Sequence, residues 1–320
     1  MMDYIILVTG LALLLIGGDI LVRGSVGLAE KLSIPPLIIG LTIVSFGTSA
    51  PELFISVKAA FEGSSGLAVG NVVGSNIANV LLVLGVPAMI YPCVCKEEGI
   101  GRNLLVMIGI TIVFMGMMVN GNLETYEGAI LFALLVLYLY SQFRNANKIR
   151  TDQNGNVNDA AEYLDDVDNI PNNGWIIAVL LAGGLILLPL GADFIVDSAS
   201  AIARSWHVSD EVIGLTIVAI GTSLPELATT LMAVFRKNVS VALGNVVGSN
   251  IFNIAGIMGI TALIVPLQVG GNIVQFDMWV MLATSLLVMY LAHFGKTIKF
   301  YHGLAMTLIY CFYIGLTLSS

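Results

Sequence analysis

The sequence contains the same apolar motif twice, and this duplication constrains the fold more than any other feature. The segment GLTIVSFGTSAPEL at 40–53 recurs as GLTIVAIGTSLPEL at 214–227, with 11 of 14 positions identical. A second pair, GNVVGSNIANV at 70–80 and GNVVGSNIFNI at 244–254, matches at 9 of 11 positions with the same offset of 174 residues. The matching residues are mainly Gly, Asn, Thr, Ser, Pro and Glu, so shared hydrophobicity does not explain them. The chain therefore consists of two related halves.

The composition places both halves in a membrane. Hydrophobic residues make up 57% of the chain and charged residues 11%, whereas soluble domains are about 25% charged. A membrane-crossing helix needs roughly 20 apolar residues. Ten candidate spans lie near residues 4–28, 35–60, 67–91, 103–119, 125–143, 174–200, 209–234, 240–265, 276–294 and 300–318. The first has no positive cluster before it and no small-residue cleavage site after it, so we expect it to be retained.

Five spans separate equivalent points of the two halves. Because five is odd, the halves must cross the membrane in opposite directions. We therefore predict an all-α integral membrane protein with ten transmembrane helices, arranged as two inverted five-helix repeats. The repeats occupy residues 1–143 and 174–320, and residues 144–173 are predicted to form an acidic cytoplasmic linker. Inverted repeats are typical of transporters that hold their substrate near the membrane midplane, between the repeats.

The distribution of Lys and Arg predicts the orientation, because cytoplasmic loops carry an excess of positive residues. With the N-terminus outside, 11 of the 13 positive residues lie at cytoplasmic ends or loops. Both termini are therefore expected outside, in a multi-pass protein of the inner (plasma) membrane. No basic patch indicates nucleic acid as a partner. The lipid bilayer is the expected environment, and no motif identifies a protein partner.

The second and seventh spans are predicted to break at a polar point. Pro51 removes a backbone hydrogen bond and clashes with the carbonyl four residues earlier, and Pro225 does the same in the second copy. The helices should therefore break near the two Gly-Thr-Ser segments. The freed carbonyl groups cannot face lipid, where an unpaired polar group costs several kcal/mol, but they can face a cation.

Each break carries a threonine and a glutamate that share one helix face. Thr48 and Glu52 are four residues apart, and so are Thr222 and Glu226; this spacing is just over one helical turn. A carboxylate near the bilayer centre is costly and by default marks a functional site. The sequence therefore assigns both glutamates a role in binding.

Neither glutamate has a nearby positive residue in the sequence. Lys58 is the only basic residue within six positions of Glu52, and none follows Glu226 before Arg236. A structural salt bridge is therefore disfavoured. We expect the missing counter-charge to be the transported ion.

The candidate ligands are all oxygen atoms, from carboxylates, hydroxyls, amides and backbone carbonyls. Hard cations such as Ca²⁺ and Na⁺ prefer these ligands, and Zn²⁺ and copper do not. Ca²⁺ takes about 6–8 oxygens, which the two glutamates, the two threonines and nearby carbonyls can supply. The two motifs are thus predicted to be halves of one cage. No nucleophile–base pair or open metal site indicates an enzyme, and no cofactor is expected beside the transported ions.

The third and eighth spans each carry a polar stripe with a spacing of four residues. The stripes consist of Asn71, Ser75 and Asn79 in the first half and Asn245, Ser249 and Asn253 in the second. Their amides and hydroxyls need partners inside a membrane, so we expect the stripes to line the site. The pairs Gly70–Gly74 and Gly244–Gly248 are expected to allow close helix packing.

At these residues the sequence resembles the sodium/calcium exchanger family, within the wider cation/calcium exchangers. The motifs GTSAPE with GNVVGSNIAN, and GTSLPE with GNVVGSNIFN, are similar to the two alpha repeats of that family. The resemblance covers the whole chain and implies exchange of Ca²⁺ against Na⁺ by alternating access. It further implies that the first and sixth spans, the latter with Pro189, form a sliding gate.

The resemblance also implies which residues hold the ions. Those implied for Ca²⁺ are Thr48, Glu52, Thr222 and Glu226. The residues implied to hold Na⁺ or to line the site are Ser45, Thr48, Ser49, Glu52, Ser75, Asn79, Ala219, Thr222, Ser223, Glu226, Ser249 and Asn253. Of these, Ser45 and Ala219 are implied to contribute backbone oxygens.

Two positions depart from common patterns of the family. Asn253 stands where the potassium-dependent branch often has Asp, so the resemblance favours exchange without K⁺. Ser45 stands where Ala is common, close to an implied sodium site. The linker is far too short for the calcium-sensing domains of animal exchangers. It also has Val157 and Tyr163 where an EF-hand loop needs Gly and Glu.

Other functions remain compatible with parts of this pattern. A proton/cation antiporter for Ca²⁺ or another divalent cation would also use buried glutamates, because burial favours the protonated form. A Ca²⁺ channel is disfavoured, since channels usually arrange parallel subunits around an axis rather than inverted halves. Dependence of Ca²⁺ uptake on a sodium gradient separates these alternatives.

Overall fold

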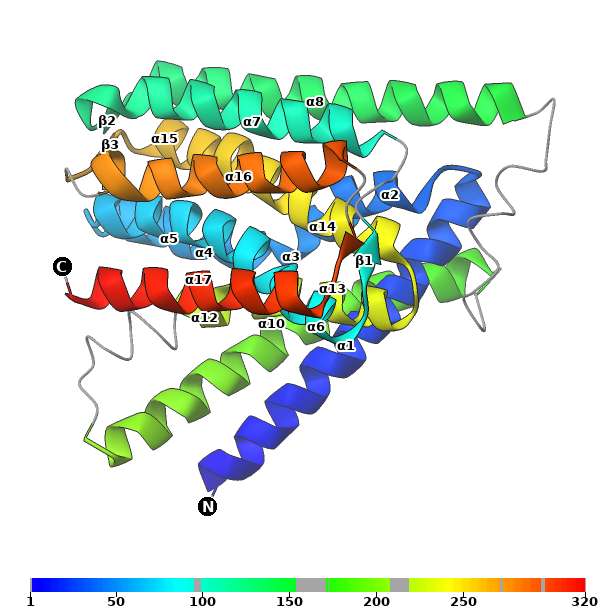
Figure 1. Cartoon of the computed structure of the whole chain (residues 1–320), viewed down its shortest axis with the longest axis horizontal. Helices are drawn as coiled ribbons and strands as arrows, with labels where there is room; N and C mark the ends of the chain where they lie inside the picture. Colours follow the sequence, from blue (N-terminus) through cyan, green and yellow to red (C-terminus); the bar gives the residue numbers. More distant parts are fainter. Residues whose placement is uncertain are drawn as a thin grey trace.

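The protein folds as a bundle of long helices (Figure 1). The computed structural model describes residues 2–94, 99–153, 171, 173–207, 219–270, 273–294 and 297–319. In Figure 1 the long helices of the main bundle run across the view, whereas α1 and α10 run obliquely along one edge of it.

The helices and strands of the first half are α1 (Met2–Leu32), α2 (Pro36–Ile39), η1 (Gly40–Val44), α3 (Ser45–Thr48), α4 (Ala50–Phe61), α5 (Ser65–Ala78), η2 (Asn79–Val83), α6 (Gly85–Ile90), β1 (Cys93–Val94), α7 (Ile100–Met117), η3 (Met118–Asn120), β2 (Asn122–Leu123) and α8 (Thr125–Gln153). Those of the second half are α10 (Gly174–Ser205), α12 (Ala219–Thr222), α13 (Leu224–Phe235), α14 (Val239–Ile251), η5 (Phe252–Met258), α15 (Gly259–Ile264), β3 (Leu267–Gln268), η6 (Ile273–Asp277), α16 (Met278–His293), β4 (Thr297–Ile298) and α17 (Phe300–Ser319).

The described residues contain eight helices that are long and apolar enough to cross a membrane. A ninth span is a bent pair, in which Pro36–Thr48 and Ala50–Phe61 meet at an angle of 44°. The remaining expected span, 209–234, lies partly outside the described residues, and its described part forms α12 and α13. An all-helical membrane protein is thus confirmed, while the count of ten helices stays a prediction.

The helix α8 extends into the segment where we expected the linker to begin, while the bounds of the two repeats stay a prediction. We expected a linker to begin at Arg144, but α8 continues to Gln153. The polar segment 144–153 contains Arg, Lys, Ala and Gln, which are good helix formers, so a helix can extend beyond the membrane without apolar residues. Residues 154–170 of the expected linker, including those of the EF-hand comparison, lie outside the described residues.

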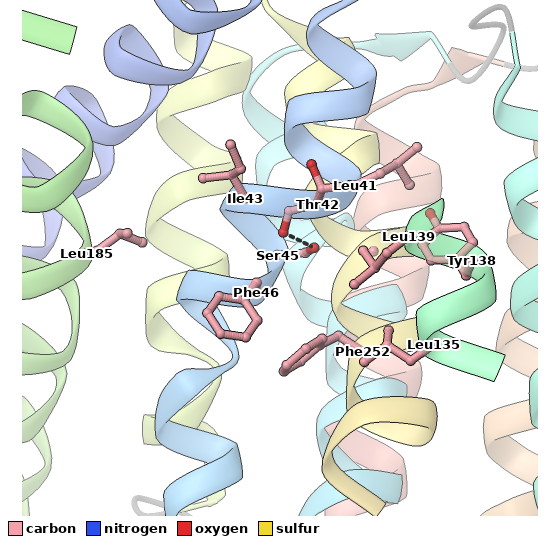
Figure 2. A pocket seen from close by; sticks show the side chains of 11 residues that line it. Leu41, Thr42, Ile43, Ser45, Phe46, Leu135, Tyr138, Leu139, Leu185 and Phe252 are labelled. Carbon is pink, nitrogen blue, oxygen red and sulfur yellow. Dashed lines mark hydrogen bonds between the residues drawn. The ribbon is translucent and has the colours of Figure 1, made fainter. Parts of the chain in front are cut away.

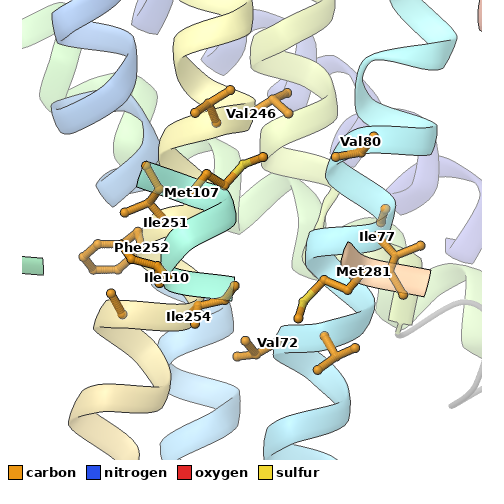
Figure 3. Packing of buried hydrophobic residues seen from close by; sticks show 14 of the residues in the cluster. Val72, Ile77, Val80, Met107, Ile110, Val246, Ile251, Phe252, Ile254 and Met281 are labelled. Atoms are coloured by element: carbon orange, nitrogen blue, oxygen red, sulfur yellow. The ribbon is translucent and has the colours of Figure 1, made fainter. Parts of the chain in front are cut away.

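Two helical segments form the centre of the bundle. Within Val239–Ile264, which comprises α14, η5 and α15, 83% of the most apolar stretch is buried, and within Ser65–Ile90, which comprises α5, η2 and α6, 72% is buried. The other spans have 22–39% buried, because their outer faces meet lipid. Figure 3 shows side chains of this centre, including Val72, Ile77, Val80, Val246, Ile251 and Ile254, packed with Met107 and Ile110 of α7 and Met281 of α16.

Two short ribbons join the halves at opposite ends of the bundle. β1 pairs antiparallel with β4, and β2 pairs antiparallel with β3. β1 precedes α7 and β2 follows it, so the ribbons are separated by the 18 residues of this helix, or about 27 Å. Because β1 follows α6 and β3 follows α15, these two equivalent helices end on opposite sides of the molecule. We call these sides the β1–β4 side and the β2–β3 side.

The oblique helices α1 and α10 pack against one another along much of their length. Glycines allow the close approach: a Cβ atom at Gly191 would lie 2.8 Å from the backbone nitrogen of Leu14, and one at Gly184 would lie 2.9 Å from the carbonyl oxygen of Gly17. α10 also reaches both helix breaks, with Leu185 against Gly47 and Val196 against Gly221. This pair is therefore in contact with the polar centre.

Candidate functional site: a buried cluster of oxygen ligands

The predicted helix breaks occur at equivalent serines. α3 ends at Thr48 and α4 begins at Ala50; Ser49 between them has φ −85° and ψ 6°. In the second copy, Ser223 separates α12 from α13 with φ −88° and ψ 4°. A proline in the first turn of each following helix is well placed, because its missing N–H would have no partner there. The near-identical angles confirm that the duplicated sequence produces a duplicated break.

The two glutamates lie in the first turns of α4 and α13, and both are fully buried. Both oxygens of Glu52 and the Oε2 of Glu226 have no hydrogen-bond donor among the described residues. Unpaired buried carboxylates are strongly unfavourable, so this centre needs positive charge, from a cation, a basic residue or a proton.

Neither nearby basic residue supplies that charge. Lys58 lies 4.0 Å from Glu62, one turn further along α4 and exposed. Arg236 lies 2.5 Å from Asp19 of α1. Both basic residues therefore have partners other than the two buried glutamates.

Hydroxyl groups from the breaks face the site from both halves. Ser49 Oγ donates a hydrogen bond to Glu226 Oε1 at 3.1 Å, which links the first break to the second carboxylate. Thr48 Oγ1 donates to Asn245 Oδ1 at 3.1 Å and lies 3.5 Å from Ser249 Oγ. Ser223 Oγ is buried without a partner among the described residues. The expected site residues of the two breaks are therefore brought together.

The first asparagine of each stripe supports the backbone at the glutamate of its own half. Asn71 Nδ2 donates to Ser56 Oγ at 3.0 Å and to the carbonyl of Glu52 at 3.3 Å. Asn245 Nδ2 makes the equivalent bonds to Thr230 Oγ1 at 3.1 Å and to the carbonyl of Glu226 at 3.4 Å. These amides fix the glutamate-bearing helices against α5 and α14.

The last asparagine of each stripe contributes a further oxygen. Asn253 Nδ2 donates to Ser75 Oγ at 3.0 Å, and Asn79 Nδ2 donates to Asn250 Oδ1 at 3.0 Å. The Oδ1 atoms of Asn79 and Asn253 have no donor among the described residues. With the three free glutamate oxygens they make five buried acceptors that can receive a cation.

Sequence reasoning missed three members of this network. Asn250 binds the amide of Asn79, and Ser56 and Thr230 receive hydrogen bonds from the first asparagines of the stripes. The 174-residue offset could have identified them, because Ser56 corresponds to Thr230 and Asn76 to Asn250.

Ser45 and Ala219 are the two positions whose backbone oxygens are expected to bind sodium, and the structure gives hydrogen bonds for the carbonyl of Ser45. The carbonyl of Ser45 accepts hydrogen bonds from the backbone N–H of Ser49 at 3.1 Å and from Thr48 Oγ1 at 3.4 Å. Ala219 begins α12. The carbonyl of Ser45 is thus oriented towards the break, but it already has partners within the protein.

The glycine pairs of the two stripes differ, which corrects one expectation. A Cβ atom at Gly244 would lie 2.7 Å from the carbonyl oxygen of Leu37, and one at Gly248 would lie 2.7 Å from that of Leu41. At Gly74 a Cβ atom would meet nothing within 4 Å, and at Gly70 only the tip of a side chain at 3.7 Å. Close packing is confirmed for the second pair. It is wrong for the first, which borders open space.

That space is a cavity of about 340 Å³ between α5, η6 and α17, here called the α5–α17 cavity. Gly74, Asn71, Ser75 and Thr222 are among its lining residues, so it reaches the predicted ion ligands. It is bordered by the first turn of α5, by η6 and by the last turn of α17. These segments place it on the β2–β3 side of the molecule.

A second pocket, of about 250 Å³, lies beside the first break and is shown in Figure 2. Ser45 Oγ donates to the carbonyl of Thr42 at 3.2 Å, and the rings of Phe46 and Phe252 stack edge to face with centroids 5.0 Å apart. Apolar residues of α8 and Leu185 of α10 complete its lining. The few polar groups here are bonded locally, so this pocket offers a cation little.

The chain matches the family profile described as sodium/calcium exchanger protein over residues 2–144 and 176–319. Sodium/calcium exchanger MaX1 of Methanosarcina acetivorans is 33% identical over 339 residues, which cover 96% of each chain. Inner membrane protein YrbG of Escherichia coli is 36% identical over 284 residues, covering 88% of this chain and 86% of YrbG.

A solved structure of the sodium-calcium exchanger NCX_Mj, soaked with Na⁺ and Sr²⁺, matches this fold with a TM-score of 0.83 and 32% identity, covering 98% of both chains. MaX1 and NCX_Mj are sodium/calcium exchangers, which are transporters and not enzymes. Their similarity extends over nearly the whole chain, including both copies of the motif. It follows that this chain belongs to the sodium/calcium exchanger protein family.

Proposed function

We propose that this protein exchanges Ca²⁺ for Na⁺ across its membrane, with Glu52 and Glu226 as the two halves of one ion site. The observation that carries the proposal is the set of three buried carboxylate oxygens without a donor. Leaving such charges unpaired costs several kcal/mol, and the neighbouring basic residues are engaged elsewhere. A bound cation offsets this cost.

Ca²⁺ is assigned to the residues at the two breaks, namely Thr48, Glu52, Thr222 and Glu226. Na⁺ is assigned to the same carboxylates together with the surrounding polar residues, namely Ser45, Ser49, Ser75, Asn79, Ala219, Ser223, Ser249 and Asn253. The five free oxygens of the glutamates, Asn79 and Asn253 support this assignment, since Ca²⁺ needs about 6–8 oxygen ligands and the hydroxyls can supply the remainder.

The charges of the site favour electrogenic exchange without K⁺. Two glutamates balance one Ca²⁺, so the calcium-loaded site is neutral. If more than two Na⁺ ions replace one Ca²⁺, the sodium-loaded site is positive, and each net charge crossing the membrane is worth about 2.3 kcal/mol per 100 mV. Because positions 79 and 253 are amides, the motifs provide no third carboxylate for a potassium ion.

Transport is proposed to follow alternating access between two inverted five-helix repeats, ten spans in all. The ribbons support the inversion, because the equivalent helices α6 and α15 end on opposite sides of the molecule. The glycine pairs support the alternation: α14 is in tight contact on the β1–β4 side, while α5 borders a cavity on the β2–β3 side. α1 and α10 are the proposed sliding gate, since they pack along one another and α10 touches both breaks.

Uptake of ⁴⁵Ca²⁺ into proteoliposomes tests this function. Vesicles loaded with Na⁺ and diluted into sodium-free buffer should take up Ca²⁺ without any K⁺ present. Setting the potential with a K⁺ gradient and valinomycin should change the rate, while valinomycin with equal K⁺ on both sides should hold it at the zero-potential value. Uptake that ignores Na⁺ but follows a pH gradient would identify a proton antiporter, and uptake without any counter-ion would identify a channel.

The β2–β3 side is proposed to be the outside of the cell, in agreement with the Lys and Arg distribution. The name of YrbG supports the inner membrane as the location. Two positions on α8 test the orientation, Thr125 at its start and Lys148 near its end, both exposed. In a cysteine-free background, Thr125→Cys should react with an impermeant thiol reagent added to intact cells, and Lys148→Cys should not. The reverse result contradicts the orientation.

A further inference from the structure

The α5–α17 cavity contains a charged group that the ion site does not explain. Asp277, at the end of η6, borders the cavity and is partly exposed. Among the described residues that line this cavity, it is the only one with a formal charge. The same lining includes Ser75 and Thr222, two of the proposed ion ligands. A carboxylate thus stands in the cavity that leads to the site.

Local structure does not account for this carboxylate. Asp277 Oδ1 accepts a hydrogen bond from Tyr313 of α17 at 2.9 Å. The side chain does not cap α16, since no backbone N–H of that helix donates to it. Asp277 forms no salt bridge among the described residues. Its one visible structural contact is the bond that joins η6 to α17.

The first repeat makes the same contact without a charge. Asn103 of α7 lies 174 positions before Asp277, and its Oδ1 accepts hydrogen bonds from Tyr138 of α8 at 3.2 Å and from Gln142 of α8 at 2.5 Å. An uncharged amide therefore accepts the tyrosine hydrogen bond in this pair of helices. Asn103 is only 5% exposed, whereas its counterpart borders a cavity. The negative charge appears only in the copy that faces the access route.

We propose that Asp277 recruits cations into the α5–α17 cavity and raises their concentration in front of the ion site. A charge at the wall of a cavity with apolar sides acts over a longer range than one in open water, because the low-dielectric walls focus its field. Hydrated Ca²⁺ and Na⁺ are the ligands that this chemistry selects, at low affinity. This role rests on the proposed exchange function and adds a residue to it.

The charge of the ion determines how large the effect should be. If Asp277 acts through its potential, a divalent ion gains twice the energy of a monovalent ion, so the enrichment of Ca²⁺ is the square of that of Na⁺. We expect Asp277→Asn to raise the half-saturating concentration about threefold for Na⁺ and about tenfold for Ca²⁺, within the range known for electrostatic focusing. Both effects should be confined to the β2–β3 side.

The experiment uses oriented proteoliposomes, with the half-saturating ion concentrations measured separately on each side. Asp277→Glu should restore the wild-type value. Tyr313→Phe, which removes the hydrogen bond but keeps the charge, should resemble the wild type, and Tyr138→Phe is the matched control in the first repeat. An equal shift on both sides, or the full shift in Tyr313→Phe, would overturn the proposal, because either result assigns Asp277 a structural role.

A second measurement separates this proposal from the exchange function. With Glu52→Gln and Glu226→Gln combined, the central site loses its charges, and the part of the Tb³⁺ luminescence that Tyr310→Phe with Tyr313→Phe removes is the signal that remains from the cavity. Adding Asp277→Asn should abolish the remaining weak signal. An unchanged signal refutes recruitment by Asp277, whether or not the wild-type protein exchanges Na⁺ for Ca²⁺.

Discussion

α5 and α14 have nearly the same sequence at their centres but different surroundings. On α14, Gly244 and Gly248 are in contact with backbone carbonyls of α2 and η1. On α5, the equivalent Gly70 and Gly74 border the α5–α17 cavity. One sequence therefore supports a closed arrangement in one half and an open arrangement in the other. The proposed alternating access requires each half to adopt both arrangements in turn.

The largest expected effect comes from the carboxylates, where the two halves should be equal. Glu52→Gln or Glu226→Gln leaves a Ca²⁺-loaded site with one uncompensated positive charge. Breaking a buried charge pair costs about 3–5 kcal/mol, so we expect Ca²⁺ exchange to fall by at least about 100-fold. Proteoliposome uptake and a thermal melt of each variant measure loss of transport and retention of fold. Near-normal exchange by either well-folded variant would refute a shared site.

The next effect should distinguish the halves. A Cβ atom at Gly248 would lie 2.6 Å from Ser45 Oγ and 2.7 Å from a backbone carbonyl, whereas one at Gly74 meets open space. Overpacking costs about 1–3 kcal/mol. Gly248→Ala should therefore lower the melting temperature, and Gly74→Ala should not.

Gly74→Ala should instead slow the transport cycle. The methyl group fits the open arrangement of α5 but would clash once α5 is packed as α14 is here. An added cost of about 1.4 kcal/mol in that state corresponds to roughly a tenfold loss of turnover. Equilibrium Ca²⁺ binding to the detergent-solubilised protein should be retained, because the open arrangement accommodates the methyl group. Full turnover by Gly74→Ala would show that α5 never closes in this way.

A third carboxylate should change which ions the site accepts. Asn253→Asp places an acid beside the two glutamates, and this acid needs a proton or a further cation. We expect Ca²⁺ uptake in Na⁺ alone to fall several-fold and to recover with K⁺ or at lower pH. Asn79→Asp is the matched variant in the first half. Uptake by Asn253→Asp that stays independent of both K⁺ and pH would contradict this description of the site.

The smallest effect is expected where the halves make the same contact. Asn71 donates to Ser56 and Asn245 donates to Thr230 at nearly equal distances. Ser56→Ala and Thr230→Val should each lower stability by about 0.5–1.5 kcal/mol, the usual contribution of one hydrogen bond. Denaturation of the two variants in detergent should give similar shifts. A much larger loss in one would show that the open and closed halves support their glutamates differently.

The sequence predicts the parts of the fold that depend on local chemistry. Pro51 and Pro225 indicate the helix breaks, and the duplicated glutamates indicate the buried polar centre, because each follows from the residue type and its neighbours. The extension of α8 to Gln153 was missed, since a solvent-exposed helix leaves no apolar pattern. The open surroundings of Gly74 could not be predicted at all. Two copies of one motif cannot indicate which copy is closed in a given state.

The salt bridge between Arg236 and Asp19 is not repeated at the equivalent positions of the two halves. With the offset of 174 residues, Glu62 is equivalent to Arg236 and Asp193 is equivalent to Asp19. Both are acidic, and Asp193 has no salt bridge among the described residues. A one-sided contact lowers the free energy of one conformation without altering ion coordination. The ion gradients and the number of Na⁺ ions per Ca²⁺ set the reversal potential of an exchanger, so this contact cannot move it. We expect it instead to make the proposed exchange rectify, so that forward and reverse modes reach half their maximal rates at different ion concentrations.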